Sequence, residues 1–495
     1  MQMGNRMDGK PRHKPRLSGA GALDMRSFVR AFLVLATVVV TSFANADLGT
    51  VNVMEARNFI AAREMAFGGS WLLPTMNGQL RIAKPPLPTW PTAVLMRMTG
   101  TDADLAVNRI PAGVCGVLLA AFTFLLARRI TGEGKLALLS MLVMCTSYIF
   151  LLSVRKNTWD IFSVTFMTGA LWALAEIVRR PAKAAVFVPA ASVMMACAFM
   201  SKGPVPFGVM LVPFVAAYAA AFGFDDLKNS LTPLLAAAFL CAVLSGLWPL
   251  YVYMNTPHAA AAVAAKETSG WFTRHTQPAW YYLLHLQELA GVWVFFLLAG
   301  VYETLVRRDR DPRARFFVWW FILTVAVVSV FPEKKLRYLL GAVVPASAVC
   351  AVALQRLKGG ARPLARAVNG AFGIVTGLLF AAGSGALVYY DGWHVQTVFM
   401  ASALAVPGAW LVLTGVRGKA SMNHQAAVAG ICLAVVFLTP TLRAHVIGDE
   451  AAPFMRIRHT EAFRGLPFFS LGEVPAEVIW ASGRVIGPLS AEDLA

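Results

Sequence analysis

The stretch Asn108-Arg-Ile-Pro-Ala-Gly-Val-Cys-Gly-Val-Leu-Leu-Ala-Ala-Phe-Thr-Phe-Leu-Leu-Ala127 decides the fold. After its opening Asn108-Arg109 pair it contains no charged side chain, and Ala, Leu, Val and Phe dominate it. A hydrocarbon core roughly 30 Å thick needs about 20 apolar residues in one helix. The stretch therefore predicts a transmembrane helix and not the amphipathic helix of a soluble protein.

Apolar runs of similar length recur along nearly the whole chain, in which 58% of residues are hydrophobic and 14% are charged. We predict an all-α, polytopic membrane helix bundle of about 13 transmembrane helices. The predicted spans are 27–46, 108–127, 136–153, 161–178, 184–200, 204–222, 231–253, 282–305, 316–331, 338–355, 367–389, 395–415 and 425–444.

The net charge of +18 does not indicate a nucleic-acid partner, because the basic residues lie in short connections between spans and form no long basic stripe. The six cysteines are spread over separate apolar runs, which excludes a disulfide framework and a cysteine metal site. No phosphate-binding glycine motif is present. No ligand spacing encodes a metal; a divalent ion is compatible with the sequence, and no cofactor is certain.

Basic clusters mark one side of the membrane, and long connections mark the other. The clusters include Arg128-Arg129, Arg179-Arg180 and the segment 307–315, and they predict cytoplasmic loops. We therefore expect a multi-pass protein of the cell inner membrane, with the first long loop 47–107 periplasmic. The expected segments are a basic cytoplasmic N-terminus (1–26), a transmembrane domain (27–444) and a periplasmic C-terminal segment (445–495). Met25 could be the true start, and Ala44-Asn-Ala46 mimics a signal-peptidase site.

Five motif-bearing segments follow one another at the predicted outer ends of the spans, and the first of them holds three motifs. The first long loop carries Met54-Glu-Ala-Arg57, Gly69-Ser-Trp-Leu-Leu-Pro74 and Lys84-Pro-Pro-Leu-Pro-Thr-Trp90. Downstream come Asn157-Thr-Trp-Asp160, Ser201-Lys-Gly-Pro204, Pro278-Ala-Trp-Tyr-Tyr282 and Glu333-Lys-Lys-Leu-Arg-Tyr-Leu-Leu340. Span centres hold few ionisable residues, which disfavours a transporter or polysaccharide flippase.

In order and spacing this series resembles the GT-C membrane glycosyltransferases of the protein O-mannosyltransferase and lipid A aminoarabinose transferase (ArnT-like) family. The resemblance covers roughly residues 30–350. It implies a GT-C bundle with periplasmic juxtamembrane helices and a small periplasmic tail. It also implies inverting transfer of a sugar from a polyprenyl-phosphate donor to an acceptor lipid, protein or cell-envelope glycan, with lipid A modification among the possibilities. Membrane lipids are the remaining partners.

The same resemblance assigns candidate residues. Removing or holding the acceptor's proton calls for a carboxylate, and the catalytic candidates are Glu55 and Asp160. Stabilising the departing phosphate calls for cations and a hydrogen-bond donor; the candidates are Arg57, Lys84, Lys202, Lys335, Arg337 and Tyr338. Aromatic residues Trp271, Trp280, Tyr281 and Tyr282 suit either a sugar face or the lipid interface. Taken alone, Lys84-Pro-Pro could instead be a rigid turn.

Two positions depart from the family pattern. The leading acidic residue of the family falls on Met54, and the acidic residue that often precedes Lys-Pro-Pro is replaced by Ala83. If the missing acid is the base, the role passes to Glu55 or Asp160, or the chain is an inactive binding or regulatory protein with the same fold.

Overall fold

The computed structural model describes residues 25–263, 265, 276–307, 311–358, 362–417, 423–447, 452–463 and 466–489. By compactness the chain forms two units, Met1–Ala36 and Thr37–Ala495. The first unit contributes the beginning of helix α1 (Met25–Phe43). Everything below concerns the second unit. Trp271, one of the predicted aromatic site residues, lies outside the described residues.

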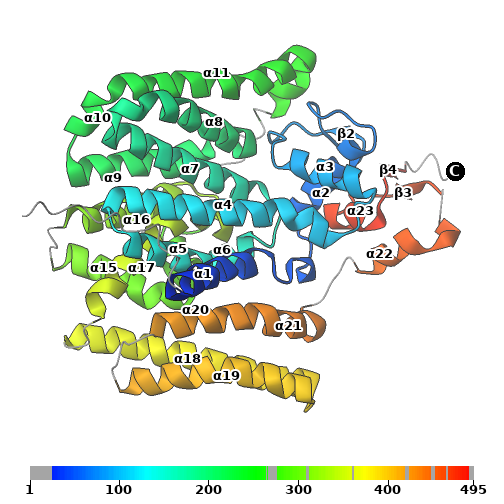
Figure 1. Ribbon diagram of the computed structural model, residues 1–495. Helices are drawn as coiled ribbons and strands as arrows, with labels where there is room; N and C mark the ends of the chain where they lie inside the picture. Colours follow the sequence, from blue (N-terminus) through cyan, green and yellow to red (C-terminus); the bar gives the residue numbers. More distant parts are fainter. Residues whose placement is uncertain are drawn as a thin grey trace, which may run out of the picture. The chain divides into compact units, whose positions relative to one another are not determined.

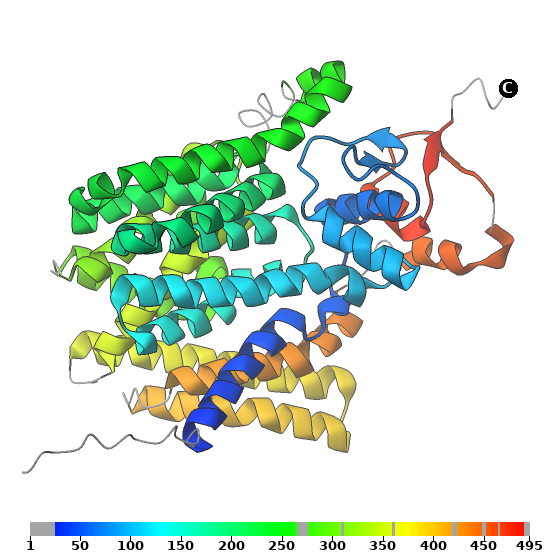
Figure 2. The ribbon, with the colours of Figure 1, turned by 45° about the horizontal axis from the view of Figure 1, so that its top comes forward.

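The second unit is a bundle of long apolar helices with a smaller group of elements at one end (Figures 1 and 2). Among the described residues, eleven helical segments are long and apolar enough to cross a membrane; the first, Ala31–Leu48, begins in the first unit, and two shorter apolar helices are Gly134–Cys145 and Phe207–Phe222. These positions match the predicted spans and confirm the all-helical membrane fold. The long helices of the bundle are α4 (Leu105–Thr131), α5 (Gly134–Cys145), α7 (Trp159–Arg179), α8 (Ala184–Lys202), α9 (Val212–Phe222), α11 (Leu231–Asn255), α15 (Val294–Leu305), α16 (Pro312–Val330), α17 (Val343–Leu357), α18 (Pro363–Asp391), α19 (Val395–Val416) and α20 (Asn423–Leu433).

Short helical pieces complete the bundle, and some of them lie within five of the predicted spans. They are η1 (Ala46–Leu48), α6 (Tyr148–Ser153), η2 (Pro181–Lys183), η3 (Phe207–Leu211), α10 (Asp225–Asn229), α13 (Tyr281–Leu284), α14 (Leu286–Ala290), η4 (Gly291–Trp293), η5 (Leu336–Ala342), η6 (Ala434–Leu438) and α21 (Thr439–His445). The predicted span 136–153 breaks between α5 and α6, where the Thr146 hydroxyl donates to the Leu142 carbonyl at 2.6 Å. A Thr side chain that bonds backward in this way competes with the helical backbone pattern.

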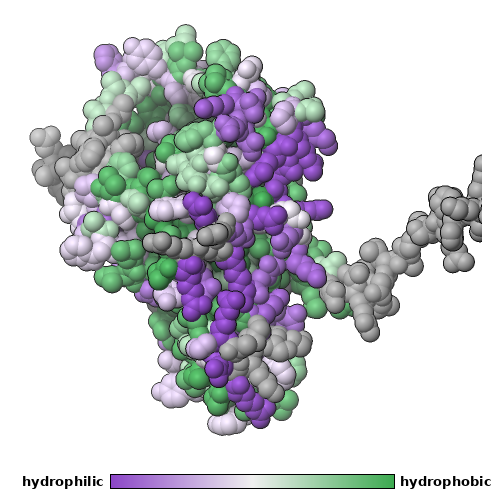
Figure 3. Space-filling view, turned by 90° about the vertical axis from the view of Figure 1, so that its left-hand side faces the viewer, coloured by the Kyte–Doolittle hydropathy of each residue, from purple (hydrophilic) through white to green (hydrophobic). Residues whose placement is uncertain are grey.

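We call the elements at one end of the bundle the cap: residues 49–104 together with 452–463 and 466–489. The cap contains α2 (Val53–Ala66), α3 (Thr89–Thr99), α22 (Ala452–His459), η7 (Glu461–Phe463) and α23 (Ala476–Ser482). Its two small sheets pair β1 (Thr75–Met76) with β2 (Gln79–Leu80) antiparallel, and β3 (Phe468–Ser470) with β4 (Ile486–Pro488) in parallel. Figure 3 looks onto the end of the bundle away from the cap, where hydrophilic residues gather.

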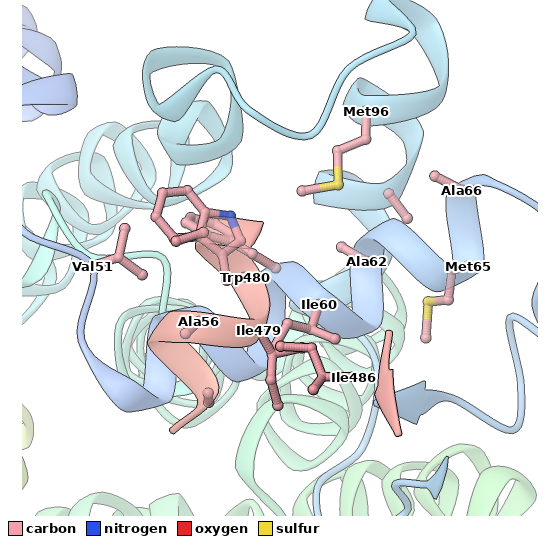
Figure 4. Close-up of a cluster of buried hydrophobic side chains, with 14 residues drawn as sticks. Val51, Ala56, Ile60, Ala62, Met65, Ala66, Met96, Ile479, Trp480 and Ile486 are labelled. Carbon is pink, nitrogen blue, oxygen red and sulfur yellow. The ribbon is translucent and has the colours of Figure 1, made fainter. Parts of the chain in front are cut away.

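The C-terminal segment packs against the first long loop, although the sequence sets them far apart. Ile60 of α2 and Met96 of α3 lie in one apolar cluster with Ile479, Trp480 and Ile486 (Figure 4). The Asn77 side chain also accepts from the Ile486 amide and donates to the Ile486 carbonyl, each at 2.8 Å. Two hydrogen bonds therefore join the turn between β1 and β2 to the start of β4.

An ion cluster fastens the same junction. The Asp102 carboxylate contacts Arg63 of α2 at 3.4 Å and Arg458 of α22 at 2.9 Å. Burial lowers the pKa of Arg63, and the neighbouring Asp102 opposes that shift. The C-terminal segment is thus part of the cap and not a loose tail.

Two spans are enclosed more fully than the others. In α7 and in the span Leu336–Leu357, 89% of the most apolar window is buried inside the protein. Asp160 stands in the first turn of α7, and Arg337 and Tyr338 stand at the start of the second span. Because both spans are held on all sides, the candidate residues at their ends sit on rigid supports.

Candidate active site

A cavity of about 540 Å³ lies where the cap meets the bundle, and it gathers most of the predicted site residues. Its walls come from α2, the segment before Pro85, the first turn of α7, the end of α8 and the segment 333–341. Seven of the eight predicted site residues line it: Arg57, Lys84, Asp160, Lys202, Lys335, Arg337 and Tyr338. Sequence segments separated by nearly 300 positions therefore meet around one space.

Positive charge predominates in the cavity. Six described cations line it, namely Arg81 and the five predicted basic residues, whereas Asp160 and Glu333 are the two acids among the described lining residues. The rest of the wall is largely apolar and includes Val209, Val328 and Phe331. A space with an excess of cations and an apolar wall suits an anionic head attached to a hydrocarbon chain.

Asp160 is buried beneath these cations, with 4% of its surface exposed. The Lys202 amine donates to its Oδ1 atom, and the Nε atom of Arg337 lies 3.6 Å from Oδ2. Lys202 and Arg337 also face the ring of Tyr338, at 4.6 Å and 5.6 Å from its centre. Asp160 thus organises the cations, and the N-terminal position in α7 further favours its negative charge.

Two guanidinium nitrogens at the cavity lack a hydrogen-bond partner among the described residues. They are the Nε atoms of Arg57 and Arg337, and both are buried. A buried donor that bonds to nothing costs on the order of 1–3 kcal/mol. Both arginines line the cavity, so an anion bound there is a candidate acceptor for these donors.

Glu55, which we predicted as a catalytic acid, has a different position. Its carboxylate forms a two-bond pair with Arg109, in which Nε meets Oε1 and Nη2 meets Oε2, each at 2.7 Å. Neither side chain has any exposed surface, and Glu55 is not among the described residues that line the cavity. The geometry favours a structural role for Glu55 over a catalytic one.

The Glu55–Arg109 pair belongs to a buried polar network next to the segment that leads into Asp160. The Asn157 amide donates to Glu55 at 2.9 Å, and the Asn157 side chain donates to Thr92 at 2.7 Å and to the Asn108 carbonyl at 2.6 Å. The network joins α2, α3 and α4 to the segment that leads into Asp160. Burial lowers the pKa of the adjacent Lys156, and the charge of Glu55 opposes that shift.

The two departures from the family pattern both lie at the cavity. Met54 and Ala83 line it, whereas Glu55, one step along α2, faces the network. Successive residues on a helix point about 100° apart, so Met54 and Glu55 cannot share a direction. The position at which the resemblance places an acid is therefore directed at the cavity and is apolar in this chain.

Of the predicted aromatic residues, Tyr282 is buried and hydrogen-bonded, whereas Trp280 lies on the surface. Tyr282 is fully buried and its hydroxyl donates to the Lys335 carbonyl at 3.3 Å, while Trp280 is 61% exposed. None of Trp280, Tyr281 and Tyr282 is among the described cavity-lining residues. Across the described part of the chain, no three His, Cys, Asp or Glu side chains are grouped to hold a metal ion.

Comparison with solved structures identifies the fold. The crystal structure of ArnT from Cupriavidus metallidurans bound to undecaprenyl phosphate superposes with a TM-score of 0.75, at 18% sequence identity, over 95% of this chain and 87% of that one. This chain has an ArnT-like GT-C fold. The same protein in its apo state superposes with a TM-score of 0.66.

Sequence comparisons agree with the ArnT-like fold. The family model described as dolichyl-phosphate-mannose-protein mannosyltransferase matches residues 83–249. The undecaprenyl phosphate-alpha-4-amino-4-deoxy-L-arabinose arabinosyl transferase 1 of Proteus mirabilis is 24% identical over 349 residues, covering 68% of this chain and 60% of the relative. An uncharacterised protein of Aquifex aeolicus is 27% identical over 320 residues, covering 64% and 62%. The matched region thus spans about three-fifths of these relatives.

The roles of two residues in and around the cavity did not follow from the sequence. Arg109 stood out only as a charge at the end of a span, and Glu333 only as the start of a basic motif. A signal for Arg109 existed, since an arginine inside an apolar helix needs a buried partner.

Proposed function

We propose that this chain is a glycosyltransferase that moves a sugar from a polyprenyl-phosphate donor to an acceptor at the periplasmic face of the inner membrane. The observation that supports this most is a single cavity at the end of the bundle that is lined both by six cationic side chains and by apolar residues. Undecaprenyl phosphate, which is part of the name of the Proteus mirabilis relative and is bound in the ArnT crystal structure, belongs to this chemical class. Lipid A, a protein or an envelope glycan is the acceptor.

The chemistry needs no nucleotide, because a sugar on a polyprenyl phosphate is already activated. The acceptor oxygen attacks the anomeric carbon, the bond from that carbon to the phosphate oxygen breaks, and polyprenyl phosphate leaves. Arg57, Lys84 and Arg337 stabilise the charge that grows on the leaving phosphate. A single displacement inverts the configuration of the anomeric carbon, and the product's configuration is measurable by NMR.

The direct test uses the purified protein in lipid nanodiscs with a synthetic undecaprenyl-phosphate-linked aminopentose and lipid A. Release of undecaprenyl phosphate, with the sugar appearing on the acceptor, supports the proposal. A peptide and an envelope glycan replace lipid A in parallel reactions. Tight binding of undecaprenyl phosphate with no transfer to any of the three acceptors would indicate a binding protein of the same fold and overturn the proposal.

Replacement of Arg57 by methionine is expected to weaken binding of undecaprenyl phosphate by roughly 10- to 100-fold. A hydrogen bond to a charged group is worth about 1.5–3 kcal/mol, and each 1.4 kcal/mol is about tenfold in affinity. Fluorescence or mass-spectrometric titration measures the dissociation constant. Arg97→Met, which removes an exposed arginine of α3, is the matched control and should bind like wild type. Equal affinities for both variants would remove Arg57 from the phosphate site.

The proposed orientation makes a separate prediction. A reporter fused after Ala495 is expected to be periplasmic, and one inserted between α15 and α16 to be cytoplasmic, because basic residues cluster in that short connection. Paired alkaline phosphatase and fluorescent-protein fusions measure the sides. If both reporters lie on the same side of the membrane, the proposed topology is wrong, and so is the proposed periplasmic position of the cap.

A further inference from the structure

The cavity contains two described acids, and they differ in how fully they are neutralised. Asp160 faces a cation at each oxygen, Lys202 at Oδ1 and Arg337 at Oδ2, and 5% of its side chain is exposed. A proton taken up by Asp160 would have to displace one of these cations from a buried site. Asp160 is therefore well suited to hold the cations and poorly suited to accept a proton from a substrate.

Glu333 has one cationic partner among the described residues, the amine of Lys335 two positions along the chain. The Lys335 side chain is 28% exposed and the Glu333 side chain 15% exposed. The Lys335 side chain is the more exposed of the two and has a flexible four-carbon stem, so its amine can turn toward solvent and leave the Glu333 carboxylate. The Glu333 carboxylate can therefore become available at the cavity without breaking the fold.

The backbone beneath Glu333 is fixed from two directions. Glu333 pairs with Thr276 in an isolated antiparallel bridge, and the Gln277 amide donates to the Pro332 carbonyl at 3.2 Å. The Lys335 amide donates to the Tyr282 hydroxyl at 3.2 Å. A carboxylate on a fixed backbone, with a flexible lysine as its ion-pair partner, is an arrangement suited to an acid or base.

Resting on the function proposed above, we propose that Glu333 is the general base of the transfer. Its carboxylate takes the proton of the acceptor hydroxyl as that oxygen bonds to the anomeric carbon, and the electron pair of the broken carbon–oxygen bond goes to the polyprenyl phosphate. Glu333 thereby fills the role that the family resemblance gives to the position of Met54. Both residues line the same cavity, from α2 and from the segment before η5.

The test compares Glu333→Gln with the double variant Met54→Asp/Glu333→Gln. Glu333→Gln is expected to lower kcat by about 10²-fold or more, the usual worth of a general base, while leaving the dissociation constant for undecaprenyl phosphate within about twofold. The double variant is expected to recover at least about tenfold of the loss, because an aspartate again faces the cavity from α2. Glu288→Gln, which changes another outer glutamate that does not line the cavity, is the control.

The outcomes separate this inference from the proposed function. If wild type transfers sugar and Glu333→Gln does so at an equal rate, Glu333 is not the base, and the glycosyltransferase function stands. If wild type binds the lipid and transfers nothing, the function itself fails, and the base role fails with it. Unchanged melting temperature and lipid binding distinguish a chemical loss from misfolding, and Glu333→Asp should keep part of the activity.

Discussion

Arg337→Met should reduce kcat by about 10²- to 10³-fold, the usual effect of removing one group that stabilises charge in a transition state. Arg337 lines the cavity, its Nε atom lies 3.6 Å from Asp160, and that nitrogen has no hydrogen-bond partner among the described residues. Methionine fills similar space without charge. Rates measured at saturating donor separate this effect from weaker binding.

Two further variants refine the Arg337 result. Arg337→Lys retains the charge and loses the planar pair of donors, so partial recovery is expected if charge is the main contribution. Arg313→Met removes an arginine that pairs with Glu133 at 3.0 Å and is 46% exposed, and it should leave kcat unchanged. An Arg337→Met enzyme with the wild-type rate would show that the departing phosphate lies elsewhere.

Arg109→Met should lower the free energy of unfolding by about 3–5 kcal/mol, because it leaves the Glu55 carboxylate buried without its cation. The two side chains are fully enclosed and share two bonds of 2.7 Å. Arg109 also donates to the Ala46 carbonyl at 2.7 Å and the Gly49 carbonyl at 2.9 Å. Denaturant or thermal unfolding in detergent measures the loss, and Arg313→Met should cost less than about 1 kcal/mol.

Unfolding and turnover measurements on Glu55→Gln distinguish between a structural and a catalytic role for Glu55. If the role is structural, Glu55→Gln destabilises the protein, and the enzyme that remains folded turns over at a nearly normal rate. The double variant Glu55→Leu/Arg109→Met should regain much of the lost stability, because a buried pair replaced by apolar groups is often close to neutral. Normal stability in Glu55→Gln together with lost turnover would restore Glu55 as the catalytic acid.

The spans were predictable because the requirement for them is local. About 20 apolar residues in a row suffice for one helix, without any knowledge of neighbouring helices. The breaks within spans were not predictable in this way. At Thr146, for example, whether a hydroxyl bonds backward depends on the packing around it, including the Trp293 indole that donates to it at 3.0 Å.

The cavity's cations could be predicted from the order of motifs, but the roles of the acids could not. Met54 and Glu55 are neighbours, and the rotation of α2 alone decides which of them faces the cavity. That rotation follows from the Arg109 contact 54 residues away. Glu333 is followed in the sequence by basic residues, which drew attention away from it. In the structure it lines the cavity, where Asp160 is the other acid among the described lining residues.

The pairing of Asn77 with Ile486 has a consequence for biosynthesis. The two partners are 409 residues apart, so at roughly 5–20 residues per second the ribosome needs about 20–80 s to make the second after the first. Throughout that interval the apolar face of α2 that packs against Ile479 and Trp480 lacks its covering helix. The cap closes only after the C-terminal segment has been made, so this intermediate with an uncovered apolar face is the natural target of chaperones and proteases.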